Sequence, residues 1–365
     1  MGARTRGIAN QILSGGLDAT DGLSGVVPSS NITNASVTSV SSTPSIGGGF
    51  DKVASDPPSP TEGDIWYNTT SNTVKGYVFG VSSWATGGNM GTPRQAGSSC
   101  GTQTAGLAFG GENASVALIT DTEEYNGTSW SEQNNLNTAR QVLSSAGTQT
   151  AGLAFGGTTP PIDGTTATEK YDGSSWTNTG SLSVKRRKAG GAGIQTAALV
   201  AGGGIGAPTY AKTTDTEEFG GTSWTSGGAL NTARNGLAAA GTQTAALVFG
   251  GNNSDGNRTG VTEEYDGSSW TTGGTLNTVR DDLGGFGTQT LGIAFGGGEP
   301  VTSNTEEYNG TSWSEQNNLS IARQNLSGAG TQPAGLATGG NRDTSVGYTE
   351  EFSGAIVEIK TLTSS

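Results

Sequence analysis

The sequence contains no histidine and a single cysteine, Cys100. Zinc sites and catalytic triads that depend on histidine are therefore excluded, and so is a disulfide within the chain. Cations are also scarce, because 18 Lys and Arg stand against 31 Asp and Glu, which gives a formal net charge of −13. This balance argues against nucleic acid or membrane insertion, because a basic surface would have to supply most of the affinity for a polyanion.

Residues arranged for catalysis are missing as well. The carboxylates outside the repeats described below are scattered, namely Asp163, Asp255, Asp281, Asp282 and Asp343. The glycine-rich stretch 202–208 lacks the order of a phosphate-binding loop, and the oxygen-rich stretch 252–260 is typical of an ordinary polar loop rather than a calcium site. We therefore expect no enzyme, no cofactor and no metal.

Long apolar runs are absent, and only 31% of residues are hydrophobic while 63 are glycine. Such a composition is typical of disordered chains. A strict internal repeat contradicts that interpretation. Tryptophans recur at steps of 46, 46, 48, 46 and 43 residues, and a glycine doublet recurs with them. The tryptophans are Trp84, Trp130, Trp176, Trp224, Trp270 and Trp313.

Each repeat holds four strand-like runs. In the second copy they are residues 142–147, which are small, 151–157, which are the most apolar, 167–171 and 174–178. A period in the forties with four short strands predicts a β-propeller, with the apolar run buried between blades. The turns 126–129 and 172–175 begin with Asn-Gly or Asp-Gly, which favours a type I′ hairpin.

The ends of the repeat array predict how a ring would close. Residues 81–87 resemble a fourth strand with no strands before them, and the last copy lacks a fourth strand. We expect strand 81–87 to complete the last blade, which would leave no open edge. Alternatively, the alternating run 355–362 could complete the last blade. If strand 81–87 completes it, run 355–362 is free to pair with a hairpin at 63–80.

Two charges recur in every copy. The first acid of the Thr-Glu-Glu-Tyr element is always Glu, whereas the second is Lys170 in one copy and is expected to be solvated. Because the first Glu shares a strand face with the buried Tyr, we expect it to form a buried ion pair at each blade junction with the repeated Arg. The residues are Glu123, Glu169, Glu217, Glu263, Glu306 and Glu350, with Arg94, Arg140, Arg186, Arg234, Arg280 and Arg323.

The segment between the glycine doublet and this element differs freely between copies. These segments are residues 112–121, 158–167, 204–215, 252–261, 298–304 and 341–348. All six are expected on one face of the ring, and a constant scaffold with variable loops is typical of a binding protein. The side chains best suited to bind sugars or polar surfaces are Tyr210, Lys212, Asp255, Arg258, Arg342 and Tyr348.

The N-terminal part matches none of the repeats. Residues 1–62 are expected to be an attachment segment, with a short amphipathic helix at 5–13 followed by a linker rich in Ser, Thr, Gly and Pro. Residues 63–80 are expected to form a β-hairpin collar, and 81–365 the propeller. The predicted fold is all-β, with an extended N-terminal anchor segment and a six-bladed propeller.

The repeats in 80–352 resemble the kelch family of β-propellers. The resemblance rests on six copies of the glycine doublet followed by Tyr or Phe and by Trp. Kelch repeats usually place more residues between the Tyr and the Trp than the four that separate Tyr125 from Trp130. The resemblance implies a six-bladed kelch-type propeller.

The whole chain is also similar to virion appendage proteins of tailed bacteriophages. The opening residues 1–15, the segment 59–78 and repeats such as 263–280 carry this similarity. It implies a virion structural protein, a tail fibre or similar appendage assembled in the host cytoplasm and attached to other virion proteins through residues 1–62. The propeller would then bind a ligand on the host surface, either a carbohydrate or a protein. Tail components of this kind are commonly homotrimers. The alternatives are a head or baseplate decoration protein without receptor role and a cytoplasmic kelch scaffold for protein partners.

Overall fold

The computed structural model describes residues 51–58, 64–79, 81–160, 163–298, 300–355 and 357–362 of the 365-residue chain. Every regular element in these ranges is a β-strand, so the fold is all-β, and no helix there could span a membrane. The chain separates into two compact units, Ser82–Gly354 and Met1–Val81 with Ala355–Ser365. The expected helix 5–13 lies outside the described residues.

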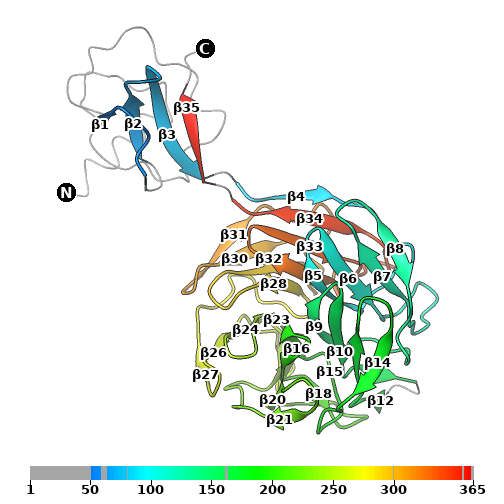
Figure 1. Cartoon of the computed structure of the whole chain (residues 1–365). Coiled ribbons are helices and arrows are strands. Elements are labelled where there is room, and N and C mark those ends of the chain that lie inside the picture. Colours follow the sequence, from blue (N-terminus) through cyan, green and yellow to red (C-terminus); the bar gives the residue numbers. More distant parts are fainter. Residues whose placement is uncertain are drawn as a thin grey trace. The chain divides into compact units, whose positions relative to one another are not determined.

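The larger unit contains six four-stranded antiparallel sheets grouped around a centre (Figure 1). Within each sheet the strands follow one another from the centre outwards, and the innermost strands are neighbours in the order β5, β9, β16, β23, β28, β32 and again β5. The first three sheets are β5 (Ser98–Thr102), β6 (Ala105–Phe109), β7 (Thr122–Tyr125), β8 (Trp130–Gln133); β9 (Ser144–Thr148), β10 (Ala151–Phe155), β13 (Thr168–Tyr171), β14 (Trp176–Thr179); and β16 (Gly190–Ile194), β17 (Ala197–Ala201), β20 (Thr216–Phe219), β21 (Trp224–Ser226). The other three are β23 (Ala238–Gly241), β24 (Ala246–Phe249), β26 (Thr262–Tyr265), β27 (Trp270–Thr272); β28 (Gly284–Gly287), β29 (Gly292–Phe295), β30 (Thr305–Tyr308), β31 (Trp313–Gln316); and β32 (Ser327–Thr331), β33 (Ala334–Thr338), β34 (Thr349–Ser353), β4 (Ser83–Thr86). The arrangement is propeller-like.

The sixth sheet takes its outer strand from the start of the unit. β4 pairs with β34, with Trp84 opposite Phe352, although the two strands lie at opposite ends of the repeat array. Residues 357–362 pair elsewhere, in the smaller unit.

Short strands in the connections join the entrance of a sheet to the loop after its second strand. They are β11 (Thr158–Thr159), β12 (Asp163–Gly164), β15 (Arg186–Arg187), β18 (Gly204–Ile205), β19 (Ala211–Lys212), β22 (Arg234–Asn235) and β25 (Asn252–Asn253). Their pairing ties the variable loops to the connections between sheets.

Glycine lets neighbouring sheets pack closely with few large side chains. A Cβ on Gly152 would lie 2.7 Å from a methyl group of Leu107, and one on Gly106 would lie 2.8 Å from a methyl group of Leu336. The leucine of one sheet therefore fills the space above a glycine of the next, and the leucines are fully buried. This packing explains how a chain with little hydrophobic content buries a core, and the burial expected for run 151–157 is confirmed except for partly exposed Ala151.

The tight turns between third and fourth strands differ from the prediction. Tyr125 pairs with Trp130, so four residues form the loop, and only Gly127 has a positive φ, of 88°. A type I′ turn needs positive φ at both central residues, so that prediction is wrong. Instead the Asn126 side chain accepts hydrogen bonds from the backbone N–H groups of Thr128 and Ser129, both at 2.9 Å.

The smaller unit is a four-stranded sheet of β1 (Asp51–Val53), β2 (Ile65–Asn68), β3 (Thr73–Phe79) and β35 (Val357–Leu362). The predicted hairpin is confirmed, with Ile65 opposite Gly76. Asp56 accepts hydrogen bonds from Lys75 at 2.7 Å and Asn68 at 2.8 Å, and these bonds lower the pKa of its carboxyl. Residues 51–58 thus belong to this sheet and not to a separate segment 1–62, and residues 357–362 join it and not the larger unit.

Candidate binding face

The repeated Arg and Glu residues form six buried ion pairs, as predicted. Nitrogen–oxygen distances run from 2.5 to 3.2 Å, and no side chain of the twelve is more than 3% exposed. The pairs are Arg94–Glu123, Arg140–Glu169, Arg186–Glu217, Arg234–Glu263, Arg280–Glu306 and Arg323–Glu350. Each Arg lies in the connection that enters a sheet, and each Glu on the third strand of that sheet.

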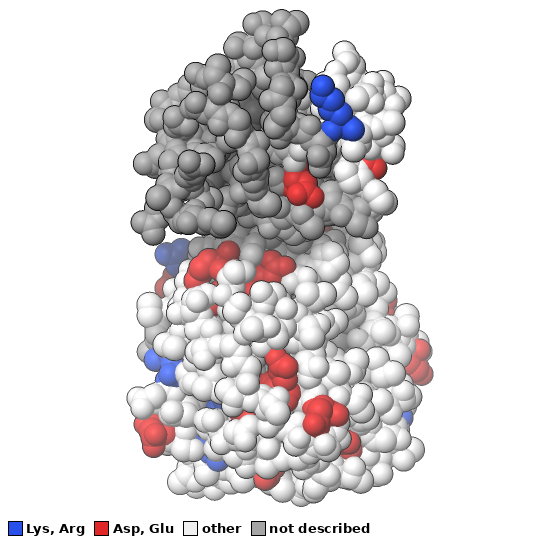
Figure 2. Space-filling model, turned by 90° about the vertical axis from the view of Figure 1, so that its left-hand side faces the viewer, with Lys and Arg blue, Asp and Glu red and all other residues white. Residues whose placement is uncertain are grey.

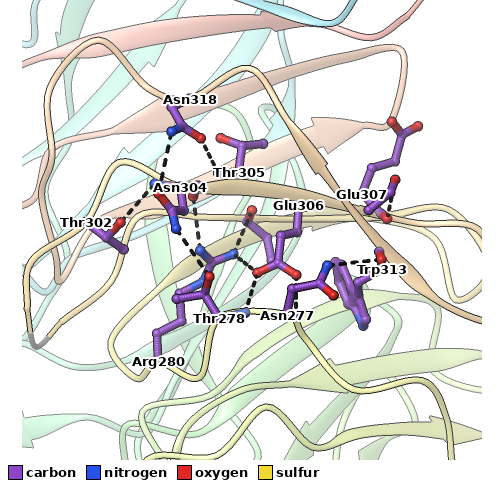
Figure 3. Close-up of polar contacts among 12 residues, drawn as sticks. Asn277, Thr278, Arg280, Thr302, Asn304, Thr305, Glu306, Glu307, Trp313 and Asn318 are labelled. Atoms are coloured by element: carbon purple, nitrogen blue, oxygen red, sulfur yellow. Dashed lines mark hydrogen bonds and ion pairs between the residues drawn. The ribbon is translucent and has the colours of Figure 1, made fainter. Parts of the chain in front are cut away.

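The pair in the fifth sheet shows what the carboxylate does (Figure 3). Glu306 accepts the backbone N–H groups of Asn277 at 2.6 Å and Thr278 at 3.2 Å as well as the Arg280 guanidinium at 3.2 Å. Its oxygens are thus occupied by the incoming connection, which they fasten to the sheet. The role is structural, and the six carboxylates do not converge on a substrate.

The second acid of the repeated element is not simply solvated, which corrects the expectation. Each of the five glutamates at this position is half-buried, and four of them accept a hydrogen bond from the Tyr hydroxyl on the next third strand. Tyr265 donates to Glu218 at 2.5 Å and Tyr308 donates to Glu264 at 2.6 Å. The tryptophans add a second bond between sheets, as where Trp270 Nε1 donates to Thr216 Oγ1 at 3.1 Å.

A circle of backbone hydrogen bonds surrounds the centre at one face. Each donor is the second residue after a repeated Arg, and each acceptor is the same residue of the preceding sheet, at 2.6 to 2.9 Å. All have a positive φ, between 49° and 64°. The members, which we call the ring residues, are Ala96, Val142, Lys188, Gly236, Asp282 and Asn325. Lys188 and Asp282 form an ion pair at 2.6 Å past Gly236, which has no side chain.

Inside this circle lies a cavity of about 210 Å³ lined by the innermost strands. Its polar side chains bond to one another or to backbone, as where Ser98 Oγ lies 2.7 Å from Ser145 Oγ and Ser99 Oγ lies 2.8 Å from Ser327 Oγ. Burial raises the pKa of the Cys100 thiol to about 12, so it stays protonated near neutral pH. The Cys100 thiol is therefore not activated as a nucleophile at neutral pH.

The variable loops emerge on the same face as the ring residues. In an antiparallel sheet the loop from second to third strand lies at the end where the first strand begins. Backbone bonds confirm the placement, as between Gln95 and Glu112 at 2.9 Å and between Asp281 and Gly298 at 2.9 Å. The face combines a constant inner circle with six unequal loops, and we call it the loop face.

Three sheets carry the predicted binding residues. Tyr210 and Lys212 lie on the third-sheet loop, Asp255 and Arg258 on the fourth, and Arg342 and Tyr348 on the sixth. The third and fourth sheets are neighbours, whereas the sixth adjoins the fifth and the first. The six residues thus do not form one cluster.

Local contacts involve some of these residues. Arg258 bonds through Nε to Asp281 Oδ1 at 2.7 Å, and Tyr210 lies beneath the guanidinium of Arg187, 4.1 Å from ring centroid to Cζ. In the 252–260 stretch, Asn253 Oδ1 accepts the backbone N–H groups of Asp255 and Asn257.

Sequence reasoning missed Arg187 and Lys188. The two residues after each repeated Arg are Gln-Ala, Gln-Val, Arg-Lys, Asn-Gly, Asp-Asp and Gln-Asn, so one copy alone has cations there. Comparing the copies at this position would have identified them. Figure 2 shows the acidic side chains of the larger unit spread among uncharged residues, with a few Lys and Arg side chains toward one edge.

Comparison with known proteins adds no family to this picture. No protein-family model matches the chain, and no curated protein sequence matches it significantly.

Proposed function

We propose that this chain is a virion appendage protein, a tail fibre or similar component of a tailed bacteriophage. Its larger unit is a closed six-bladed kelch-type propeller that binds host-surface carbohydrate through the loop face. The resemblance of residues 1–15, 59–78 and the repeats to phage appendage proteins supports the class of protein.

One observation supports the binding role above others. The contacts within and between sheets repeat from copy to copy, whereas the loops on one face differ in length, charge and aromatic content. A scaffold held constant with one unequal face is the usual construction of a recognition surface. The circle of backbone bonds, which returns to its starting residue, supports ring closure.

Attachment to other virion proteins is proposed for the N-terminal segment. Because β1 and Asp56 belong to the smaller sheet, a deletion should spare them and remove residues 1–50. The shortened chain should fold but fail to enter particles. Incorporation at the normal level would argue against an N-terminal anchor, and the mass of the full chain in solution tests the homotrimer.

Host binding is tested with the full chain on host cells and on a glycan array. Binding that is competed by soluble glycan supports the proposal. If the chain enters particles but binds neither cells nor glycans, it is a decoration protein. If it enters no particle and captures soluble proteins through the loop face, it is a cytoplasmic scaffold.

A further inference from the structure

The cations of the larger unit are distributed unevenly. Ser82–Gly354 contains thirteen Lys and Arg, and six of them are the buried partners of the repeated Glu. Of the seven others, five lie in the entrance and loops of the third and fourth sheets, namely Lys185, Arg187, Lys188, Lys212 and Arg258. In a chain of charge −13, this grouping gathers most of the remaining cations of the larger unit in one sector of the loop face.

Acidic neighbours neutralise part of this group. Lys188 pairs with Asp282 at 2.6 Å, and Arg258 pairs with Asp281 at 2.7 Å. Among the described residues, Arg187 and Lys212 have no carboxylate partner. Their charges are therefore available to a ligand.

Strand pairing aligns these two cations on one side of a small sheet. Arg187 on β15 is opposite Gly204 on β18, and Gly204 is opposite Lys212 on β19. Directly opposite residues of antiparallel strands point to the same side. Arg187 and Lys212 therefore flank Gly204, with two strand spacings, about 10 Å, between their Cα atoms.

Tyr210 occupies the space above the glycine. A Cβ on Gly204 would lie 3.3 Å from Tyr210 Cβ and 3.3 Å from Asn235 Nδ2, so only glycine leaves this room free of crowding. The Arg187 guanidinium stacks on the Tyr210 ring, which orients its planar fork. The loop that carries Tyr210 and Lys212 is also the longest of the six, at 12 residues.

We propose that Arg187, Tyr210 and Lys212, with the amide of Asn235, bind a sugar that carries a carboxylate, in an acidic polysaccharide. A guanidinium fork matches a carboxylate through two parallel hydrogen bonds, and an ammonium group adds a second positive charge. The aromatic ring and the amide suit the apolar and hydroxyl-bearing parts of a sugar ring. This inference rests on the proposed function, because it names the chemical class of the carbohydrate.

The test measures binding of the full chain to immobilised polygalacturonate, to the same polymer after methyl esterification, and to polyglutamate. We expect polygalacturonate to bind at least about tenfold more tightly than the other two, and its affinity to fall as salt rises. Equal binding of the esterified polymer would overturn the carboxylate claim while leaving carbohydrate binding intact. Equal binding of polyglutamate would overturn the saccharide claim.

Matched variants localise the site. Arg187→Gln introduces the residue found at this position in three other copies. Tyr210→Asn introduces a residue that tolerates the positive φ of this position. Each should weaken polygalacturonate binding about tenfold with an unchanged melting temperature, whereas Lys52→Gln, which removes an exposed cation from β1 of the smaller unit, should have no effect. An unchanged affinity in Arg187→Gln would overturn the assignment. If the wild-type chain binds no polymer here and no host cell or glycan elsewhere, the proposed function itself fails.

Discussion

At the scale of single residues, charges and rings are matched across five of the six sheet interfaces. Where the third strand carries Tyr, the preceding sheet supplies Glu at the second acid position, as with Tyr171 and Glu124 at 3.0 Å. Where Phe219 replaces Tyr, the preceding sheet supplies Lys170 at that position, and its ammonium group lies 5.4 Å from the Phe219 ring centroid. The matched residues come from different repeats, so each pair links two sheets.

The buried Arg–Glu pairs give the first prediction. Arg234→Ala leaves Glu263 buried without its partner, which should lower the free energy of unfolding by about 3–5 kcal/mol. Arg258→Ala breaks a pair whose Arg side chain is 31% exposed and should cost less than about 1 kcal/mol. Urea denaturation of the full chain measures both. Equal stability of Arg234→Ala and wild type would contradict the structural role of the pair.

Glu307 gives a prediction about pH. The next third strand carries Phe352 where four of the others carry Tyr, and burial raises the pKa of the Glu307 carboxyl above the ordinary 4.5. A raised pKa means that the folded state binds more protons, so this contribution to stability is full below about pH 4.5 and is lost as pH rises through the folded-state pKa. Glu307→Gln should therefore be more stable than wild type at pH 7, by less than about 1 kcal/mol because water screens the group. The difference should vanish toward pH 4.

Thermal unfolding at both pH values checks this, with Glu264→Gln as the control. Glu264 accepts the Tyr308 hydroxyl at 2.6 Å, so removing its charge should weaken the fold at pH 7. If Glu307→Gln and Glu264→Gln shifted the melting temperature in the same direction at pH 7, the lack of a Tyr hydroxyl opposite Glu307 would not explain its effect on stability.

At the scale of elements, the ring residues set the entrance of every sheet. Six residues share a left-handed conformation, which costs most for a β-branched side chain, yet Val142 adopts it with φ of 49°. The backbone bond from Val142 to Ala96, at 2.6 Å, and its acceptance of the Lys188 N–H hold it there. Packing of the neighbouring sheets thus imposes the conformation on an unsuitable residue.

The positive φ of the ring residues predicts opposite effects on stability for two substitutions. Val142→Gly should raise the free energy of unfolding by about 1 kcal/mol, because it removes the steric strain of positive φ. Gly236→Val should lower it by more, since a Cβ there would lie 2.9 Å from Asp282 Oδ1 and disturb the Lys188 pair. Chemical denaturation of the two variants measures both changes in the free energy of unfolding. Destabilisation by Val142→Gly would mean that Val142 contributes packing that outweighs its strain.

The sequence predicted what repeats within one copy and missed what depends on neighbouring copies. The strands and the Arg–Glu pairs follow from the period and from alternation along a strand. The bonding of Glu124 to Tyr171 could not be predicted because the two residues lie in separate repeats. The circle of hydrogen bonds depends on a positive φ at each ring residue. Ala96 and Val142 are residue types that rarely adopt a positive φ, so the sequence did not predict it. The stacking of Arg187 on Tyr210 required the pairing of β15 with β18.

At the scale of the whole molecule, the two ends of the chain pair twice. β4 pairs with β34 in the larger unit, and β3 pairs with β35 in the smaller unit. Each unit is thus completed by strands from both ends of the sequence. One connection joins β3 to β4, and a second joins β34 to β35.

The larger unit should therefore fold without the smaller unit. A chain of residues 82–354 is expected to melt near the temperature of the larger unit in the full chain, because it keeps all six sheets. Residues 88–354 lack β4, expose the edge of β34 and remove Trp84 from Phe295 and Phe352, so they should melt well below it. Circular dichroism on heating distinguishes the two. Equal melting temperatures would show that β4 does not contribute to the stability of the larger unit.

The double pairing of the chain ends also bears on resistance to proteases. One cut between β3 and β4 would leave both fragments held, because β3 remains paired along β35 and β4 remains paired along β34. A cut between β34 and β35 would be tolerated for the same reason. Both connections must be severed before the two units separate, so a nicked molecule keeps its smaller unit in an environment rich in peptidases.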